Sequence, residues 1–193
     1  HISIPYFSNL RYSAARLSDG SLVVWGDNSG GQCNVPPPPP GLAYVEVASG
    51  LQCTLARLSD GSVVAWGDNS RGQLDVPPLP PGVTYVEIAA AAYFSGPPSN
   101  DVRSNTLARR SDGTVIAWGD NVNGQCNVPA LLSGSMYQEI AASGNFTIAR
   151  VGPDLTCPTP TNYCASGMNS LGGYATITSE GSTSIAANDF ALV

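Results

Sequence analysis

A tetrapeptide, Trp-Gly-Asp-Asn, occurs three times in this chain and limits what the chain can fold into. Its copies begin at Trp25, Trp66 and Trp118, so successive copies lie 41 and 52 residues apart. Ala-Arg, Ser-Asp-Gly, Gly-Gln and Val-Pro recur around it in the same order, and Ala-Arg occurs a fourth time, ending at Arg150. Repeats of about 40 residues are typical of propellers and solenoids, in which each unit buries an apolar surface against its neighbours.

Each unit predicts short antiparallel strands joined by tight turns. An apolar run of strand length ends at each tryptophan and does not alternate with polar residues, which indicates that both faces of its sheet are buried. These runs are residues 22–25, 63–66 and 115–118. Asp-Gly before each run is a hairpin signal, because glycine tolerates the positive φ of such turns. The turn glycines are Gly20, Gly61 and Gly113. Tyr44, Tyr85 and Tyr137 each begin a further predicted strand.

The conserved order of motifs suggests structural roles for the tetrapeptide itself. We expect Trp25, Trp66 and Trp118 to lie as wedges between neighbouring sheets, because burying an indole contributes several kcal/mol at ~25 cal/mol per Å² over 150–250 Å². The aspartates that follow are expected to close the adjoining turn through side-chain to backbone hydrogen bonds. They are Asp27, Asp68 and Asp120.

The composition excludes several classes of protein. Only 11% of residues are charged, all eight basic residues are arginines, and the net charge is −6. Binding to nucleic acid needs clustered cations, which this chain lacks. No apolar run approaches the ~18 residues that a membrane-spanning helix needs. No long stretch rich in Ala, Glu, Lys and Leu is present to form a coiled coil or helix bundle.

We therefore predict an all-β fold: a partial, open β-propeller of about three to four blades made of antiparallel sheets, followed by an incomplete β-rich C-terminal segment. The propeller repeats are assigned to residues 1–150, and the Ser-, Thr- and Gly-rich start of a C-terminal β-domain to residues 151–193. The units are placed near 8–47, 48–88 and 89–140, with the start of a fourth at 137–150. We expect a truncated ring, whose open blade edges favour self-association.

The residues do not predict a catalytic or metal site. His1 is the only histidine and lies at position 1, so no internal histidine is present for a Ser-His-Asp triad or a Cys-His pair. Cys33 and Cys126 occupy the position of Leu74 in the middle unit, which favours apolar packing over metal binding. Cys157 and Cys164 are the disulfide candidates, in an oxidising compartment. We predict no catalytic residue, no metal site and no cofactor.

An insertion of 11 residues in the third unit breaks the symmetry of the repeat. Insertions in repeat proteins map to loops and often lie on a binding face. Tyr93, Phe94, Asn100 and Asp101 are therefore candidate binding residues. A neutral lengthening of the loop is the alternative, because long insertions cost little free energy.

The pattern Ala-Arg-x-Ser-Asp-Gly-x-Val-x-Ala-Trp-Gly-Asp-Asn-x-x-Gly-Gln resembles the regulator of chromosome condensation repeat, over roughly residues 8–150. The resemblance implies a β-propeller, which is seven-bladed in that family. The short unit with Val-Pro after Gly-Gln is most similar to the bacterial secreted branch, which includes propeller-type β-lactamase inhibitory proteins. Members of the family act as nucleotide-exchange factors, enzyme inhibitors or surface modules. The family commonly has a histidine at the positions of Tyr12, Cys53, Asn105 and Phe146, which this chain lacks.

Three functions follow as hypotheses. The first is a non-enzymatic propeller scaffold of a secreted or surface bacterial protein, a localisation that the resemblance implies, which binds protein or glycan partners through its blade loops. The second is a purely structural repeat segment of a long adhesin-like protein. The third is an enzyme that uses the repeated carboxylates at the propeller rim for acid–base chemistry.

Overall fold

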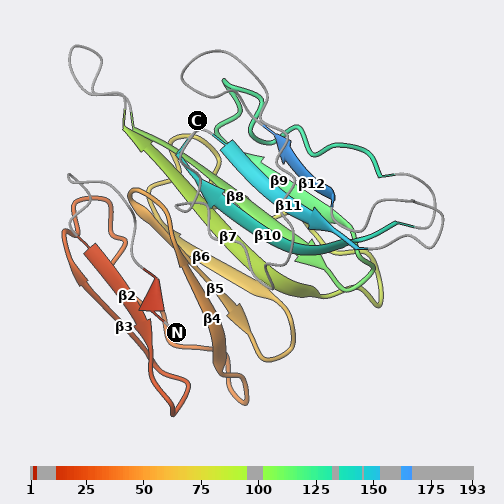
Figure 1. The fold of residues 1–193 in the computed structure, drawn as a ribbon. Helices are drawn as coiled ribbons and strands as arrows, with labels where there is room; N and C mark the ends of the chain where they lie inside the picture. The colour runs from red at the N-terminus through yellow and green to blue at the C-terminus, as the bar shows by residue number, and fades with distance from the viewer. Residues whose placement is uncertain are drawn as a thin grey trace.

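Four antiparallel sheets, each of three strands, make up the regular structure of the described part of the chain (Figure 1). The computed structural model describes residues 2–3, 12–94, 102–131, 135–144, 146–152 and 162–166. The strands are β1 (Ile2–Ser3), β2 (Tyr12–Arg16), β3 (Leu22–Gly26), β4 (Tyr44–Ser49), β5 (Cys53–Leu58), β6 (Val63–Gly67), β7 (Tyr85–Phe94), β8 (Val102–Arg110), β9 (Val115–Gly119), β10 (Tyr137–Ser143), β11 (Phe146–Val151) and β12 (Asn162–Ser166). Over these residues we find only strands and turns, and no helix that could cross a membrane.

The sheets follow one another across the molecule in chain order, with sheet orders β1-β2-β3, β4-β5-β6, β7-β8-β9 and β10-β11-β12 (Figure 1). The first strands of successive sheets lie side by side: β4 contacts β7, and β7 contacts β10. Within each of the first three sheets, the predicted Asp-Gly turn joins the second strand to the third. Stacked antiparallel sheets that meet along their first strands have the architecture of an open β-propeller.

The repeat units of the sequence do not coincide with these sheets. A unit placed at 8–47 ends with the strand that begins at Tyr44, whereas this strand is β4 and pairs with β5 of the next sheet. The physical reason is the length of the connecting loops. A tight turn at residues 50–52 joins β4 to β5, whereas a long loop separates β4 from β3. Beyond the boundary expected at residue 150, β12 lies in the segment 151–193 and pairs with β11 in the fourth sheet. The assignment of a separate C-terminal domain stays a prediction.

Tryptophans at equivalent positions of the second and third sheets join each of these sheets to the one before it. Trp66 and Trp118 are each 8% exposed. The indole Nε1 of Trp66 donates to the carbonyl oxygen of Gln32 at 2.8 Å, and that of Trp118 donates to Gln73 at 3.0 Å. Each ring also lies near a tyrosine that begins the same sheet, with centroids 6.5 Å apart for Tyr44 and Trp66. These contacts combine apolar burial with a satisfied buried polar group, which an indole requires.

Trp25 does not act as a buried wedge, and our expectation for it was wrong. Its side chain is 50% exposed, and it lies on the same face of the first sheet as Val23 and Leu17, which are 44% and 45% exposed. The equivalent of Leu17 in the second sheet is Leu58, which is 1% exposed because the first sheet covers it. No segment among the described residues covers the corresponding face of the first sheet.

A glutamate and an arginine in each of the later sheets form a second link between neighbours. Arg57 Nε donates to Glu46 Oε2 at 2.8 Å within one sheet, and Glu46 Oε1 accepts the backbone N–H of Ile88 in the next sheet at 3.2 Å. Glu87 repeats this arrangement with Arg109 and the N–H of Ile140. Burial raises the pKa of Glu87 above its usual value, although the Arg109 hydrogen bond opposes the shift.

The insertion in the third unit lengthens a hairpin. β7 and β8 pair continuously out to Phe94 and Val102. In the second sheet the equivalent hairpin is shorter, because β4 ends at Ser49 and β5 begins at Cys53. Tyr93 therefore lies in a strand and is half-buried, whereas the sequence predicted that it belongs to an exposed loop. Small residues in this stretch allow the longer strands to pack, since Ala91 and Ala92 are buried.

The wedge role of tryptophan can be tested by comparing two equivalent positions. We expect Trp66→Phe to lower the free energy of unfolding by about 1–3 kcal/mol, because it removes a buried hydrogen bond and leaves space. Trp25→Phe should change it by less than about 0.5 kcal/mol, because this side chain is half exposed. Urea unfolding followed by far-UV circular dichroism measures both. Equal losses for the two variants would contradict the wedge role.

Candidate functional site

The sheets present two opposite edges, which carry different chemistry. We call the edge with the Ser-Asp-Gly turns and the proline segments the proline edge; it includes residues 19–22 and 35–44 and their counterparts in later units. The other edge, the aspartate edge, carries the Trp-Gly-Asp-Asn loops and the turn at 50–52, since Cys53 pairs with Gly67 there. The long β7–β8 hairpin also points toward the aspartate edge.

Hydrogen bonds within each loop occupy the repeated aspartates. Asp68 Oδ2 accepts from Gln73 Nε2 at 2.8 Å and from Ser70 Oγ at 2.6 Å. Asn69 donates to Asp75 at 2.8 Å and accepts the backbone N–H of Leu74 at 2.8 Å. Asp27 and Asp120 accept the corresponding glutamine bond, from Gln32 Nε2 at 3.4 Å and from Gln125 Nε2 at 2.6 Å. These carboxylates hold the loop that receives the next tryptophan, because Gln73 also supplies the carbonyl that Trp118 binds.

The acid–base hypothesis has no geometric basis on this edge. Each aspartate sits in the loop of a different sheet and is bonded to neighbours in its own loop. Asp120, which is buried, also lies 4.0 Å from Arg103 Nη1. In the part of the chain that the structure describes, no group of three or more His, Cys, Asp or Glu side chains could hold a metal ion.

The structure describes only part of the binding site predicted in the insertion. Tyr93 lies in β7 and pairs across the hairpin with Arg103 of β8. Phe94 ends β7, and Asn100 and Asp101 lie outside the described residues. The binding role of these four residues stays a prediction.

Cys33, Cys53 and Cys126 are free thiols. Cys33 and Cys126 donate from Sγ to the carbonyl oxygens of Asp27 and Asp120, both at 3.2 Å. Burial raises the pKa of Cys126 to about 12, and burial likewise raises the pKa of Cys53 to about 12. The disulfide between Cys157 and Cys164 stays a prediction, because Cys164 is in β12 but Cys157 lies outside the described residues.

The proline edge contains the same open cavity twice. One cavity, of about 480 Å³, lies where the first sheet meets the second, and the other, of about 420 Å³, lies where the third meets the fourth. The first is lined by Asp19, Gly20, Ser21, Leu22, Val35, Pro36, Pro37, Pro38, Leu42, Ala43 and Tyr44. Each lining residue of the second lies 93 positions after its counterpart, from Asp112 for Asp19 to Tyr137 for Tyr44. The repeat thus builds a recurrent surface feature.

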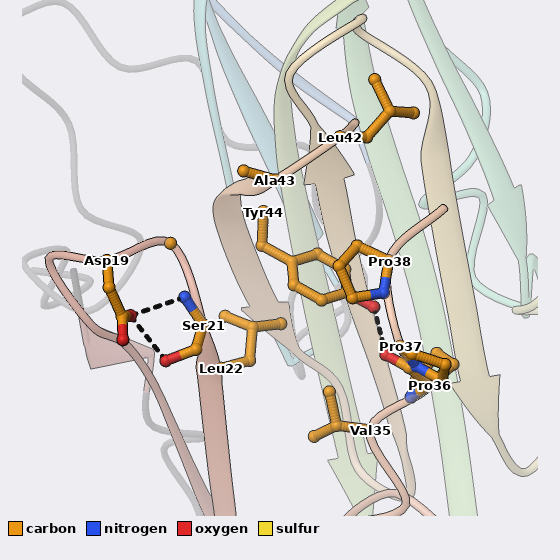
Figure 2. A pocket seen from close by; sticks show the side chains of 11 residues that line it. Asp19, Ser21, Leu22, Val35, Pro36, Pro37, Pro38, Leu42, Ala43 and Tyr44 are labelled. Carbon is orange, nitrogen blue, oxygen red and sulfur yellow. Dashed lines mark hydrogen bonds between the residues drawn. The ribbon is translucent and has the colours of Figure 1, made fainter. Parts of the chain in front are cut away.

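Each cavity combines an apolar wall with one fixed charge. Figure 2 shows Asp19 and Ser21 on one side of the Tyr44 ring and the proline segment on the other. Tyr44 Oη donates to the carbonyl oxygen of Pro36, which fixes the ring in the wall. Asp19 Oδ1 accepts from Ser21 N at 2.9 Å and Ser21 Oγ at 2.6 Å, and the Ser21 hydroxyl and amide hold the pKa of Asp19 below its usual value. A carboxylate at the rim therefore stays ionised beside proline, tyrosine and leucine.

Sequence reasoning missed this site because it treated Val-Pro only as a marker of the repeat. A usable signal was present: an Asp-Gly turn, a Val-Pro segment and a tyrosine recur at fixed spacing in all three units. What the sequence could not show is that these three segments meet at one junction between sheets.

The stacked sheets and their repeated junctions define a β-propeller-type repeat protein. The chain carries repeats of the regulator of chromosome condensation (RCC1) family, since residues 44–73 and 103–125 match the model of that repeat. No curated protein sequence matches the chain.

Solved structures with the same fold include plant, yeast and human propellers. The CRINKLY WD40 ectodomain of the Arabidopsis thaliana receptor kinase ACR4 superimposes with a TM-score of 0.60 at 19% identity, covering 86% of this chain and 55% of that one. Prp20p from Saccharomyces cerevisiae has a TM-score of 0.59 at 20% identity, covering 83% and 42%. Human WBSCR16 has a TM-score of 0.56 at 17% identity, covering 86% and 50%. The chain thus spans about half the length of these structures.

The raised thiol pKa values predict slow alkylation in the folded state. At pH 8.5, we expect Cys53 and Cys126 to react with iodoacetamide at least tenfold more slowly in the folded chain than in urea, because only the thiolate is nucleophilic. The rate in urea should rise as pH passes 9, whereas the folded rate should stay low until near pH 12. In a Cys157→Ser/Cys164→Ser background, Cys33, Cys53 and Cys126 are the remaining thiols, and peptide mass spectrometry measures the alkylation of each one. Alkylation of folded Cys126 at the unfolded rate would contradict its burial.

Proposed function

We propose that this chain is a non-enzymatic, protein-binding scaffold that contacts its partner through the proline edge. The observation that carries the proposal is that the same open cavity occurs at two junctions, between the first and second sheets and between the third and fourth. Repetition of an apolar, weakly charged surface along an arc suits recognition of an extended or repetitive partner. Catalysis instead needs reactive groups that converge on one point.

The chemistry of the cavity favours a protein over a glycan as the partner. Its wall is made of proline, leucine, valine and a tyrosine whose hydroxyl already donates to a backbone carbonyl. The polar groups at the rim of the first cavity are Asp19 and Ser21, and these bond to each other. A sugar site would need several side-chain donors and acceptors directed at the ligand. Apolar side chains of a protein partner fit this wall better.

Fold relatives support a role in protein binding. Yeast Prp20p has binding properties toward Gsp1p and histones, and a second structure shows Kap60 bound to the same yeast protein. Those partners belong to Prp20p, and the likeness to this chain extends to the fold alone. Placement in a secreted or surface bacterial protein is also proposed, on the resemblance of the short Val-Pro unit to the secreted branch of the family.

Selection of natural partners tests the edge directly. A phage-displayed library of genomic fragments from the source organism would be selected on the immobilised chain, and the affinity of each enriched fragment measured by biolayer interferometry. We expect Ala43→Arg together with Met136→Arg to weaken binding at least tenfold, because both exposed residues lie next to the junction tyrosines of the two cavities. A tenfold loss corresponds to about 1.4 kcal/mol.

Val122→Arg is the matched control, because Val122 is 65% exposed and lies in a loop of the aspartate edge. This variant should bind each fragment as the unmodified chain does. Enrichment of no fragment over an unrelated protein, or equal weakening by the control, would overturn the proposal.

A further inference from the structure

The loops that lead into the second and third sheets carry runs of exposed prolines. Residues 36–40 are five consecutive prolines, and residues 77–81 read Pro-Pro-Leu-Pro-Pro. Residues 37–40 are exposed, as are Pro78, Pro80 and Pro81. Proline fixes φ near −65°, and a residue before proline is driven to extended backbone. These restrictions favour the polyproline II conformation along both runs, each of which ends in a turn at Pro40-Gly41 or Pro81-Gly82. We call residues 36–40 and 77–81 the first and second proline ridges.

The packing of the ridges shows the period of that conformation. Polyproline II has three residues per turn, so every third residue faces the same way. In the second ridge the residues packed against the core are Val76 and Leu79, three apart. Val128 and Leu131 have the same spacing in the third unit. Pro77 is half-buried between these inward positions, whereas Pro78, Pro80 and Pro81 are exposed on the outer faces.

Hydrogen bonds anchor each ridge at both ends. Tyr44 Oη donates to the Pro36 carbonyl and Leu42 N donates to that of Pro39 at 3.0 Å. In the second ridge, Tyr85 Oη donates to the Pro77 carbonyl at 2.6 Å and Val83 N donates to that of Pro80 at 3.1 Å. The ridges are thus rigid, and a partner that binds them has little backbone entropy to remove.

The fold itself does not require these prolines. In the third unit the equivalent segment begins Pro129-Ala130-Leu131, yet it keeps the inward Val128 and Leu131 and the hydrogen bond from Tyr137 to the Pro129 carbonyl. The extended path is therefore set by the two inward residues and the tyrosine. The outward prolines of the first two units are additional, and they are exposed.

We propose that the two proline ridges are ligands for a partner module whose groove is lined by aromatic side chains and recognises polyproline II, of the type found in WW domains. Such grooves take prolines at positions i and i+3, and both ridges present that spacing on a solvent-facing side, as in Pro37 and Pro40 or Pro78 and Pro81. No Lys or Arg lies within four residues of either ridge, so the contact is to aromatic rings and not to an acidic pocket. This proposal rests on the proposed function and specifies the class of partner.

The probe is an isolated WW domain that binds a Pro-Pro-Leu-Pro peptide. It carries a fluorescent dye, is titrated with the folded chain and is followed by fluorescence anisotropy, because the chain has three tryptophans of its own. We expect saturable binding, which a free peptide of residues 76–82 competes away. Replacing Pro37, Pro40, Pro78 and Pro81 by alanine should weaken binding at least tenfold. Pro129→Ala is the matched control in the unit without a ridge and should leave binding unchanged. Far-UV circular dichroism and cooperative urea unfolding establish that each variant is folded.

A graft makes the test independent of loss of stability. Ala130→Pro, Leu132→Pro and Ser133→Pro build Pro-Pro-Leu-Pro-Pro in the third unit, and in the ridge-deficient background they should restore binding. The proposal is overturned if the unmodified chain binds the probe no better than the ridge-deficient variant, or if the graft folds without restoring binding. The proposed function would survive that failure if genomic fragments still lose affinity for the Ala43→Arg/Met136→Arg variant.

Discussion

The contact between each buried tryptophan and the Gly-Gln loop of the preceding sheet is the constraint on which the other features depend. Each sheet has two apolar faces and cannot be stable in water alone. The indole buries a large apolar surface and places its N–H on the carbonyl of Gln32 or Gln73. Since the same glutamine side chain bonds the loop aspartate, one residue fixes the loop shape and receives the next sheet. The motif therefore encodes stacking as well as a turn.

This arrangement explains how much of the fold could be predicted from the sequence. Strands, Asp-Gly turns and the propeller class follow from local pattern, because the period of the motif and the apolar runs are local properties. The exposure of Trp25 does not, since it depends on what covers a face and not on the residue itself. The assignment of the Tyr44 strand to the next sheet was missed for a similar reason: strand pairing is decided by loop length and not by where a motif ends.

The candidate site was harder to predict than the fold. The insertion attracted attention because it breaks symmetry, yet it continues a hairpin out to Phe94 and Val102. The proline-edge cavities were missed because they preserve symmetry, and their three segments meet only when two sheets stack. In a repeat protein, a motif that recurs in every unit has either a structural role or a surface role. The packing around the motif shows which role it has. Asp68 and Asp19 illustrate this difference, the first bonded within its loop and the second at a cavity rim.

Comparison among the units separates what the fold requires from what it permits. Every unit keeps an inward valine, a tyrosine bonded to a proline carbonyl and an aspartate turn, because these close the junction between sheets. Outward positions are free to vary: the third unit has Ala130 at the position where the first two units have Pro37 and Pro78. The packing of the core therefore does not require Pro37 and Pro78, which belong to the surface. A rigid apolar ridge that is exposed to water has no packing role within the chain. The proposed recognition by a partner explains why the prolines are there.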